Sequence, residues 1–368
     1  MLAKATIQQD SGLMEVHWMQ TRGKWDEYIL SGDIGGTNTN IAIVGRTGEE
    51  YRIILKLRFE SAQITDFAPV VRQTLDLIKE TDSRFFPSRG CLCAAGPIRE
   101  NRSSPTNLAW NVDGDALTRE FSLPFNVMND FQAICLALPL INGGDNNFLL
   151  PVTHTDGSTP VPHGETKAVA GAGTGLGVGL LTRTAGRLIS LPSEGGHTDF
   201  APFDQETEEL HQYVASRHDA PPGMELLLSG RGMAEIFNFY RDHKKVTLDG
   251  ALEIIGNASE KEVPKLISRY CTENAACRAM MKLFIRIFGN FASRVSLFFL
   301  PYAGMYLAGG IIIRHSNLIL EDDNFMRVFE SNYNEKIRGV LKTIPVYIVN
   351  DYSISLLGAA HAAVLSTG

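Results

Sequence analysis

The alternation of apolar and polar positions predicts strands near the start of the chain. Residues 28–33 suit a strand, residues 39–45 resume as a strand after a glycine-rich turn, and residues 53–59 place apolar side chains at every second position. Three successive strands of this kind predict an antiparallel meander. Apolar residues at helical spacing follow at 66–79 and 131–140, and short buried strands are expected at 91–97 and 122–130.

The second half of the chain repeats this beginning. A strand at 167–172, a glycine-rich turn at 173–177 and a further strand at 178–182 reproduce the first hairpin about 140 residues later. Two more strands are expected at 305–310 and 345–351, the second before an alanine-rich helix that ends the sequence. The pattern therefore predicts an internal duplication in which strands and helices form α/β layers.

The most apolar helix candidate, residues 276–300, is long enough to raise the question of a membrane span. Polar side chains recur in it at every fourth position, which places them in one stripe along the helix. The stripe consists of Arg278, Lys282, Arg286, Asn290 and Arg294. We therefore predict a core helix and no membrane partner.

Composition narrows the class of protein. The 368 residues, 44% hydrophobic and 20% charged, predict a folded protein of about two to three domains. The net charge of −7 argues against a nucleic-acid partner, which needs a basic surface. Five cysteines without a CxxC pair indicate reduced thiols and a cytosolic location. Residues 1–27 contain no apolar signal segment and are expected to form a loosely attached extension.

The two glycine-rich turns are candidates for phosphate binding. A dinucleotide fingerprint must open a helix, whereas both turns lead into strands. Backbone N–H groups that no side chain screens can bind phosphate oxygens, and Thr37, Asn38 and Thr174 could add side-chain donors. Asp33, ahead of the first turn, is the oxygen ligand that Mg²⁺ beside a polyphosphate would use directly or through water. The alternative is a pair of ordinary β-turns.

Asn129 and Asp130 lie at the carboxyl end of an apolar strand, where α/β sheets place ligand-binding residues. The Asp130 carboxylate could accept the proton of an attacking hydroxyl while Asn129 binds a neighbouring hydroxyl. The alternative is that Asp130 is the N-cap of the helix that follows.

Glu194 and His197 stand three residues apart around Gly195 and Gly196. In a loop this spacing can direct a carboxylate and an imidazole to one point, as polyol recognition requires. Zinc is the alternative, although neither a cysteine-rich segment nor an HExxH motif accompanies the pair. By composition Glu225 belongs to a solvated face, followed by a helix that begins at an N-cap, Ser229.

Taken in order, the motifs GDIGGTN, NDF, GAGTGLG, LPSEGGHTDF, LLSGRG, LAGGI and LLGAAHA resemble those of bacterial-type glucokinases outside the repressor/ORF/kinase family. The resemblance covers residues 29–365. It implies a two-domain actin-like (ribonuclease H-like) ATPase fold with a duplicated β-hairpin core and an interdomain cleft. The domains are then 28–140 plus 350–368 (small) and 141–349 (large). The extension, residues 1–27, and the polar insert at 142–163 have no counterpart that the resemblance identifies.

The resemblance implies ATP-dependent phosphorylation of the glucose 6-hydroxyl with Mg²⁺, and a homodimer. It assigns the catalytic base to Asp130 and sugar contacts to five further residues: Asn107, Asn129, Glu194, His197 and Glu225. ATP binding is assigned to the two turns and the late glycine pair: Asp33, Gly35, Gly36, Thr37, Asn38, Gly173, Thr174, Gly309 and Gly310.

Three alternatives remain open. Pocket residues alone do not fix the sugar, so a kinase for mannose, fructose or an amino sugar is one. A non-catalytic sugar sensor is the second, although 27 leading residues are too few for a helix-turn-helix domain. An actin- or Hsp70-like ATPase would keep the hairpins but would have no use for the residues assigned to the sugar.

Overall fold

The structure, a computed structural model, describes residues 13–19, 24–105, 108–141, 148–321, 323–351 and 353–366. It divides into two compact units, each described here by itself. Unit 1 consists of residues 1–145 and 352–368, and unit 2 of residues 146–351. The carboxyl-terminal helix therefore belongs to the same unit as the first strands.

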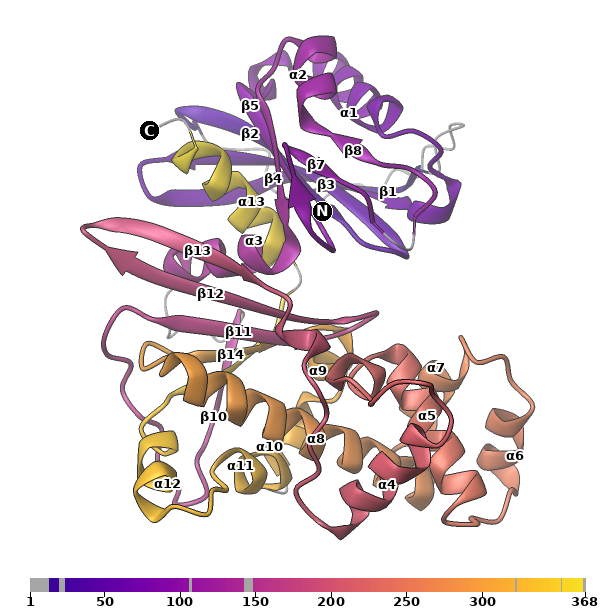
Figure 1. Ribbon diagram of the computed structural model, residues 1–368. Helices are drawn as coiled ribbons and strands as arrows, with labels where there is room; N and C mark the ends of the chain where they lie inside the picture. Colours follow the sequence, from indigo (N-terminus) through magenta and orange to yellow (C-terminus); the bar gives the residue numbers. More distant parts are fainter. Residues whose placement is uncertain are drawn as a thin grey trace. The chain divides into compact units, whose positions relative to one another are not determined.

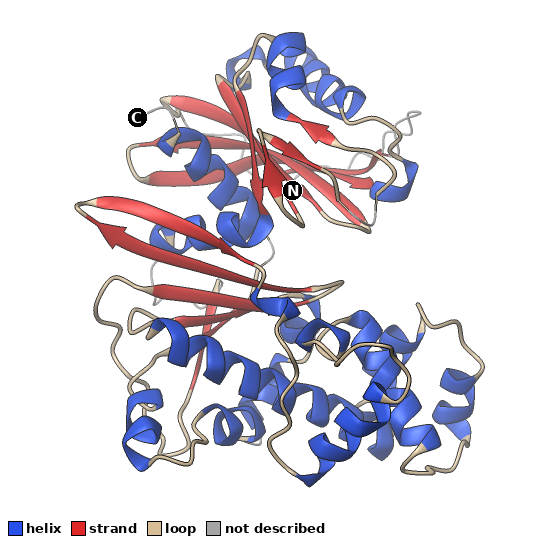
Figure 2. Ribbon diagram, in the orientation of Figure 1, coloured by secondary structure: helices blue, strands red, loops and turns tan. Residues whose placement is uncertain are grey.

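Unit 1 is built on a six-stranded sheet with the order β1-β4-β3-β2-β5-β9 (Figures 1 and 2). The strands β2, β3 and β4 pair antiparallel in sequence order, which confirms the predicted meander, whereas β5 and β9 continue the sheet in parallel. The strands are β1 (Leu13–Trp18), β2 (Glu27–Ile34), β3 (Asn38–Thr47), β4 (Glu50–Glu60), β5 (Arg89–Ala94) and β9 (Phe125–Asn129). A small separate sheet contains β6 (Ile98–Arg99), β7 (Arg102–Ser103) and β8 (Val112–Asp113).

Helices cover both faces of this sheet. On one face α1 (Ala68–Thr81) and α2 (Gly114–Phe121) join a core with Leu30, Ile41 and other strand residues. On the other face α13 (Ile354–Leu365) lies beside α3 (Asp130–Ala137), as Figure 1 shows. A Cβ at Gly358 of α13 would stand 1.7 Å from the carbonyl oxygen of Ala133 in α3. Only glycine allows the two helices to approach this closely.

The amino-terminal segment is attached more firmly than the sequence suggests. Residues 13–18 form β1, which pairs antiparallel with β4 at the edge of the sheet. Val16 lies opposite Leu57 and is only 2% exposed. The expectation of a loosely attached extension is therefore wrong for residues 13–18, because ladder hydrogen bonds and a buried apolar side chain hold them to the sheet.

Unit 2 is built on a sheet with the order β10-β15-β14-β11-β12-β13. Its strands are β10 (Leu149–Val152), β11 (Lys167–Ala172), β12 (Leu176–Thr184), β13 (Arg187–Ser193), β14 (Met305–Ala308) and β15 (Val346–Val349). The run β13-β12-β11-β14-β15 repeats β4-β3-β2-β5-β9 in order and direction, with an antiparallel meander followed by two parallel strands. This match confirms the predicted duplication.

The polar insert contributes an edge strand to unit 2. β10 pairs antiparallel with β15, and the chain beyond it carries His154, whose side chain is buried. The His154 Nδ1 atom lies 2.8 Å from Glu330 Oε1, and its Nε2 atom donates to the carbonyl oxygen of Ile344 at 3.0 Å. Residues 142–147 of the insert lie outside the described residues.

Helices gather on one side of the unit 2 sheet, as Figure 2 shows. They are α4 (Gln205–Ala215), α5 (Gly230–Asp242), α6 (Gly250–Gly256), α7 (Val263–Tyr270), α8 (Ala275–Phe299), α9 (Gly310–Arg314), α10 (Ser316–Glu321), α11 (Asn324–Phe329) and α12 (Glu335–Leu341). α8 is the predicted core helix, and its polar stripe is half-buried. Across the described part of the chain, no helix has the length and apolar character that a membrane span requires.

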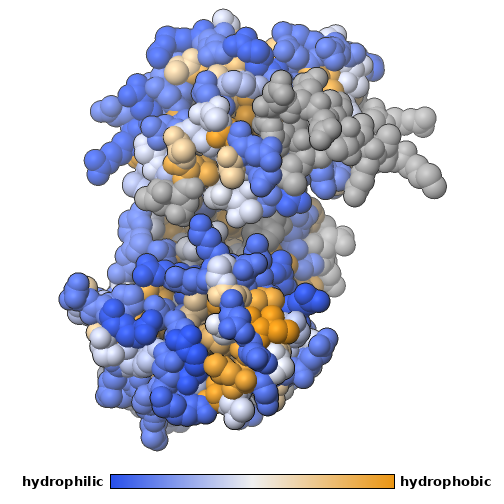
Figure 3. Space-filling view, turned by 90° about the vertical axis from the view of Figure 1, so that its right-hand side faces the viewer, coloured by the Kyte–Doolittle hydropathy of each residue, from blue (hydrophilic) through white to orange (hydrophobic). Residues whose placement is uncertain are grey.

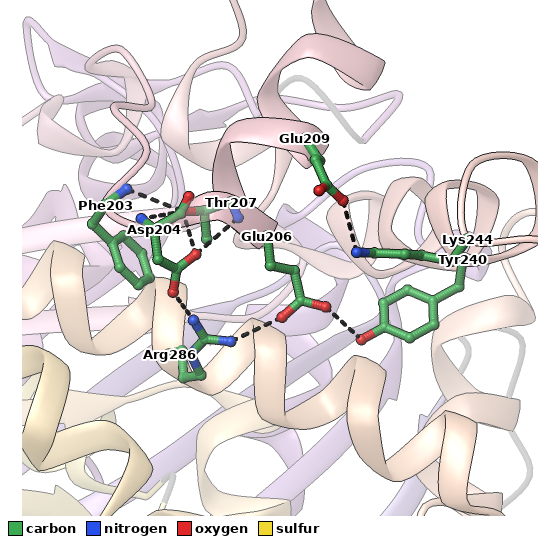
Figure 4. A network of polar contacts seen from close by, with 8 residues as sticks. All are labelled: Phe203, Asp204, Glu206, Thr207, Glu209, Tyr240, Lys244 and Arg286. Carbon is green, nitrogen blue, oxygen red and sulfur yellow. Dashed lines mark hydrogen bonds and ion pairs between the residues drawn. The ribbon is translucent and has the colours of Figure 1, made fainter.

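The polar stripe of α8 is tied to neighbouring helices. Arg286 forms ion pairs with Asp204, just ahead of α4, and with Glu206 of α4, the latter at 2.9 Å (Figure 4). The Tyr240 hydroxyl of α5 donates to Glu206 Oε1 at 3.1 Å. Asp204 also caps α4 by accepting from the backbone N–H of Thr207 at 2.9 Å. The network therefore joins α8 to α4 through the Arg286 guanidinium, and α4 to α5 through the Glu206 carboxylate.

Candidate active site

The first glycine-rich turn connects β2 and β3 and is held by several hydrogen bonds. The Gly35 N–H donates to the carbonyl oxygen of Asn38 at 3.0 Å, closing the hairpin. The Ser61 N–H donates to the carbonyl oxygen of Thr37 at 3.1 Å. The Asn38 side-chain oxygen accepts from Arg58 Nε at 3.1 Å and Nη2 at 3.0 Å. Hydrogen bonds within the hairpin and from β4 and the residue after it thus hold the turn. Gly36 and Thr37 are exposed at its tip.

Asp33 precedes this turn on β2 and is half-buried. The Ser355 hydroxyl of α13 donates to its Oδ2 atom at 2.8 Å, and the Cys93 thiol of β5 lies 3.9 Å from its Oδ1 atom. Burial raises the pKa of the Asp33 carboxyl above its ordinary value, although the hydrogen bond from Ser355 opposes this shift. A carboxylate whose charge is disfavoured by burial gains from a nearby cation, which fits Mg²⁺.

Among the residues that the structure describes, no three His, Cys, Asp or Glu side chains form a group that could hold a metal ion. Mg²⁺ commonly binds through one or two carboxylates together with phosphate oxygens and water. Asp33 could supply one such carboxylate in unit 1.

Asn129 and Asp130 lie at the junction of β9 and α3. The Asn129 side-chain oxygen accepts from the N–H groups of Phe131 at 2.9 Å and Gln132 at 3.3 Å, so Asn129 is the N-cap. Its Nδ2 atom donates to the carbonyl oxygen of Gly96 at 3.3 Å. The alternative that Asp130 is the N-cap is therefore wrong by one residue.

Asp130 is the first residue of α3 and is half-buried. Its Oδ1 atom accepts from the N–H of Phe131 at 2.9 Å. A negative charge at this end of a helix is favoured by the unpaired N–H groups of the first turn. The position therefore places a carboxylate at the carboxyl end of β9, next to the start of a helix, where a negative charge is favoured.

The second glycine-rich turn connects β11 and β12. The Gly173 N–H donates to the carbonyl oxygen of Gly175 at 2.8 Å, and the Gly173 carbonyl accepts from the N–H of Gly230 at 2.9 Å. Thr174 is exposed at the tip. This turn is therefore anchored through the carbonyl oxygen of its first glycine, as the first turn is through the Gly35 carbonyl, which accepts from the Ser61 hydroxyl at 2.7 Å.

Gly309 and Gly310 lie next to the second turn, because β14 pairs in parallel with β11. Gly309 has φ +101°, and a Cβ there would stand 2.1 Å from the carbonyl oxygen of Ala172. Gly309 is thus required both by its backbone conformation and by the close approach to β11. The two segments that the resemblance assigns to ATP in unit 2 are therefore neighbours.

Glu194 and His197 lie close together at a single 3-10 turn, η4 (Gly195–His197). The His197 Nε2 and Glu194 Oε2 atoms are 3.6 Å apart, with 61% and 67% of the side chains exposed. Both groups are therefore available to a ligand. Gly196 packs against the backbone of Leu176, the first residue of β12, where a Cβ would stand 2.0 Å from the carbonyl oxygen.

Glu225 belongs to another 3-10 turn, η5 (Met224–Leu226), which joins the same region. The Met224 N–H donates to the carbonyl oxygen of Thr198 at 2.8 Å. The Glu225 Oε2 atom accepts from the N–H of Leu176 at 2.9 Å. The expectation that Glu225 lies on a solvated face is wrong, because its carboxylate is half-buried and bonded to the base of the second turn. Ser229 is confirmed as the N-cap of α5, accepting from the Gly232 N–H at 3.2 Å.

The predicted residues thus form one group in each unit. Unit 1 brings together Asp33, the first turn and the Asn129–Asp130 pair through adjacent strands, and unit 2 brings together the remaining predicted residues around the second turn. Asn107 lies outside the described residues. Ser61, Cys93 and Ser355 contact the unit 1 group and were missed, because single serines and cysteines carry no sequence signal for such a role.

Comparison with known proteins gives one consistent family. A family model described as Glucokinase matches residues 30–366. A curated glucokinase of Nostoc sp. (strain PCC 7120 / SAG 25.82 / UTEX 2576) is 32% identical over 349 residues, covering 91% of this chain and 98% of that protein.

Solved structures agree with this match. The crystal structure of a glucokinase from an Antarctic psychrotroph has a TM-score of 0.75 at 27% identity, covering 92% of this chain and 98% of that one. A ROK family glucokinase from Streptomyces griseus, in complex with glucose and AMPPNP, has a TM-score of 0.61 at 16% identity, covering 93% of this chain and all of that one. The expected actin-like ATPase fold is thereby confirmed.

Proposed function

Because the chain belongs to the glucokinase family, we propose that it transfers the terminal phosphoryl group of ATP to the 6-hydroxyl of glucose, the first step of glycolysis. The observation that carries this proposal is the family match over residues 30–366, which includes every residue of the candidate site. Units 1 and 2 would be the small and large domains of the enzyme.

In this proposal the two glycine-rich turns bind the nucleotide phosphates. Backbone N–H groups at their tips are free of side-chain cover, as phosphate oxygens require. Gly309 and Gly310 would hold the adenosine part of the nucleotide, and their position beside the second turn supports this role. Thr37 and Thr174 are exposed at the tips and would add hydroxyl donors.

Asp130 is proposed as the general base, which accepts the proton of the glucose 6-hydroxyl as the phosphoryl group arrives. Its carboxylate lies at the start of α3, at the carboxyl end of β9, where α/β sheets place ligand-binding residues. Phosphoryl transfer otherwise depends on positioning and charge neutralisation more than on covalent help. Asp33 would hold Mg²⁺, which when bound neutralises charge on the phosphates.

Glucose would be bound by the carboxylates, amides and imidazole that the resemblance assigns to it. Glu194 and His197 offer an exposed acceptor and donor 3.6 Å apart, suited to hydroxyls that both donate and accept. Glu225 has one carboxylate oxygen engaged by Leu176, and its other oxygen would accept from a sugar hydroxyl. Asn107 and Asn129 are the remaining residues that we propose to bind glucose.

The decisive experiment measures ADP formation from ATP and Mg²⁺ with and without glucose. We expect turnover that depends on glucose. Equal ADP formation without sugar would favour an actin- or Hsp70-like ATPase, and no turnover with any sugar would favour a sensor. Mannose, fructose and glucosamine in parallel assays would show whether another hexose is the better substrate.

We further propose that the chain belongs to the branch outside the repressor/ORF/kinase family. The zinc motif of that family uses clustered cysteines, whereas the five cysteines here contain no CxxC pair, form no disulfide and are buried. Reduced thiols also support a cytosolic location. Metal analysis of the purified protein tests the branch: stoichiometric zinc would contradict it.

A homodimer is proposed as the working assembly. Unit 2 presents grouped apolar side chains on the face that Figure 3 displays. Exposed apolar surface of this kind often marks a protein interface. Light scattering at micromolar concentration tests this point, and a mass equal to one chain would contradict it.

A further inference from the structure

A buried serine directly after β4 donates two hydrogen bonds to the first glycine-rich turn. Ser61 follows β4 directly and is 1% exposed. Its hydroxyl donates to the carbonyl oxygen of Gly35 at 2.7 Å, and its backbone N–H donates to the carbonyl oxygen of Thr37 at 3.1 Å. We propose that Ser61 is a positioning residue for the nucleotide phosphates, an inference that rests on the proposed kinase function.

The direction of the hydroxyl hydrogen bonds follows from their number. A carbonyl oxygen can only accept, so the single Ser61 proton goes to Gly35. The Thr39 hydroxyl, 2.9 Å from the Ser61 oxygen and fully buried, must then be the donor in that contact. A chain of two hydroxyls therefore ends on the Gly35 carbonyl and holds it from the protein interior.

The Gly35 carbonyl decides where a backbone donor points. The C=O and N–H of a trans peptide point in opposite directions, and the described residues contain no cis peptide. Because the carbonyl of the Gly35–Gly36 peptide points to Ser61, the Gly36 N–H points away from it, toward the exposed tip of the turn. A peptide between two glycines can rotate with little steric resistance. The Ser61 hydroxyl therefore keeps this N–H directed outward, where a phosphate oxygen would bind.

A tryptophan holds Ser61 in turn. The Trp110 Nε1 atom donates to the carbonyl oxygen of Ser61 at 3.3 Å, and its ring stacks on Phe67 with centroids 5.5 Å apart. Trp110 is 5% exposed and follows the predicted sugar residue Asn107 by three positions. The support of the turn thus extends from Phe67 and Trp110, in the core of unit 1, through Ser61 to the Gly35 carbonyl.

The test compares nucleotide and sugar binding in the full-length Ser61→Ala variant. We expect the Kd of AMPPNP, measured by calorimetry, and the KM of ATP to rise about fivefold to tenfold. The Kd of glucose measured without nucleotide should change less than twofold, because no sugar contact is removed. Ser61→Thr, which keeps the hydroxyl, should restore most of the AMPPNP affinity.

Ser31→Ala is the matched control. Ser31 is a fully buried serine of β2 in the same unit, and its hydroxyl has no hydrogen-bond partner among the described residues. This control should leave both Kd values within twofold of the wild type. If Ser61→Ala does not fold, Trp110→Phe, which keeps the ring stack but loses the Nε1 donor, should still raise the AMPPNP Kd about twofold to threefold.

Three outcomes overturn the inference. They are an AMPPNP Kd within twofold of the wild type in the folded variants, equal losses of AMPPNP and glucose affinity, or the same loss in Ser31→Ala. Failure of the proposed function looks different, since the wild-type protein itself would then form no ADP in response to sugar. The two failures are therefore distinguishable.

Discussion

The two glycine-rich turns share one backbone design but are supported by different groups. In unit 1 the carbonyl of Gly35 accepts from the Ser61 side chain at 2.7 Å, whereas in unit 2 the carbonyl of Gly173 accepts from the backbone N–H of Gly230 at 2.9 Å. A side-chain donor is lost in one substitution, but a backbone donor survives all substitutions except proline. The duplication thus repeats the topology without repeating the way in which each turn is held.

The two sheets also differ at their edges. Beyond the shared five strands, unit 1 adds β1 beside β4, on the meander side, whereas unit 2 adds β10 beside β15, on the parallel side. Both added strands come from segments that the family resemblance did not account for. The two units therefore extend the same core on opposite sides.

An Asn-Asp pair lies at the carboxyl end of the last core strand in both units, and the largest expected effect distinguishes the two pairs. Asn129 is the last residue of β9 and is followed by Asp130, whereas Asn350-Asp351 comes directly after β15. We expect Asp130→Asn to lower kcat at least about 100-fold while glucose binding stays nearly normal, because only the proton acceptor is lost. Asp351→Asn should lower kcat less than about threefold. Steady-state kinetics check both, and comparable losses would remove the functional difference between the repeats.

The next effect concerns the glycine beside the second turn. Gly309→Ala should destabilise the protein by about 2–4 kcal/mol, because its positive φ is unfavourable for alanine and the new Cβ would overlap the carbonyl of Ala172. Gly339→Ala in α12, where a Cβ meets no atom within 4 Å, is the control and should be neutral or slightly stabilising. Urea unfolding measures both, and a loss below about 1 kcal/mol for Gly309→Ala would contradict the close approach.

A smaller effect is expected at the exposed Glu194–His197 pair. Glu194→Gln should raise the glucose KM at least about tenfold, because a site built to accept hydroxyl protons is left mispaired. Glu165→Gln, a change of another exposed glutamate in unit 2, should leave this KM unchanged. An unaltered KM in Glu194→Gln would place Glu194 outside the sugar site.

The smallest expected effect is a pH dependence of stability that comes from a buried histidine of unit 2. Burial lowers the pKa of His315 in unit 2 to about 4 from 6.5, and its Nε2 atom is hydrogen-bonded to the Ser268 hydroxyl at 2.7 Å. Between these pH values the unfolded chain binds a proton that the folded chain does not, so stability falls as pH falls. The loss from this group is about 0.7 kcal/mol between pH 7 and pH 6. Urea midpoints should show a flatter profile for His315→Gln, and parallel profiles would contradict the assignment.

Sequence patterns predicted the local features of this fold correctly. Period-two apolar residues identified the meander, helical spacing identified α1 and α8, and Ser229 identified the start of α5. They failed at Asn129, where the cap is one residue earlier than expected, and at Glu225, which looked solvated. In both cases a hydrogen-bond partner that the pattern does not name decides the outcome.

The sequence by itself determined the elements, their duplication and the family, because these depend on residue order and spacing along one chain. Only the tertiary structure decided which groups support the candidate site. The Ser355 hydroxyl reaches Asp33 across 322 positions, and Trp110 reaches Ser61 across 49. Such contacts are set by how strands and helices pack in three dimensions. A lone serine in the sequence therefore does not reveal which carbonyl or carboxylate its hydroxyl will meet.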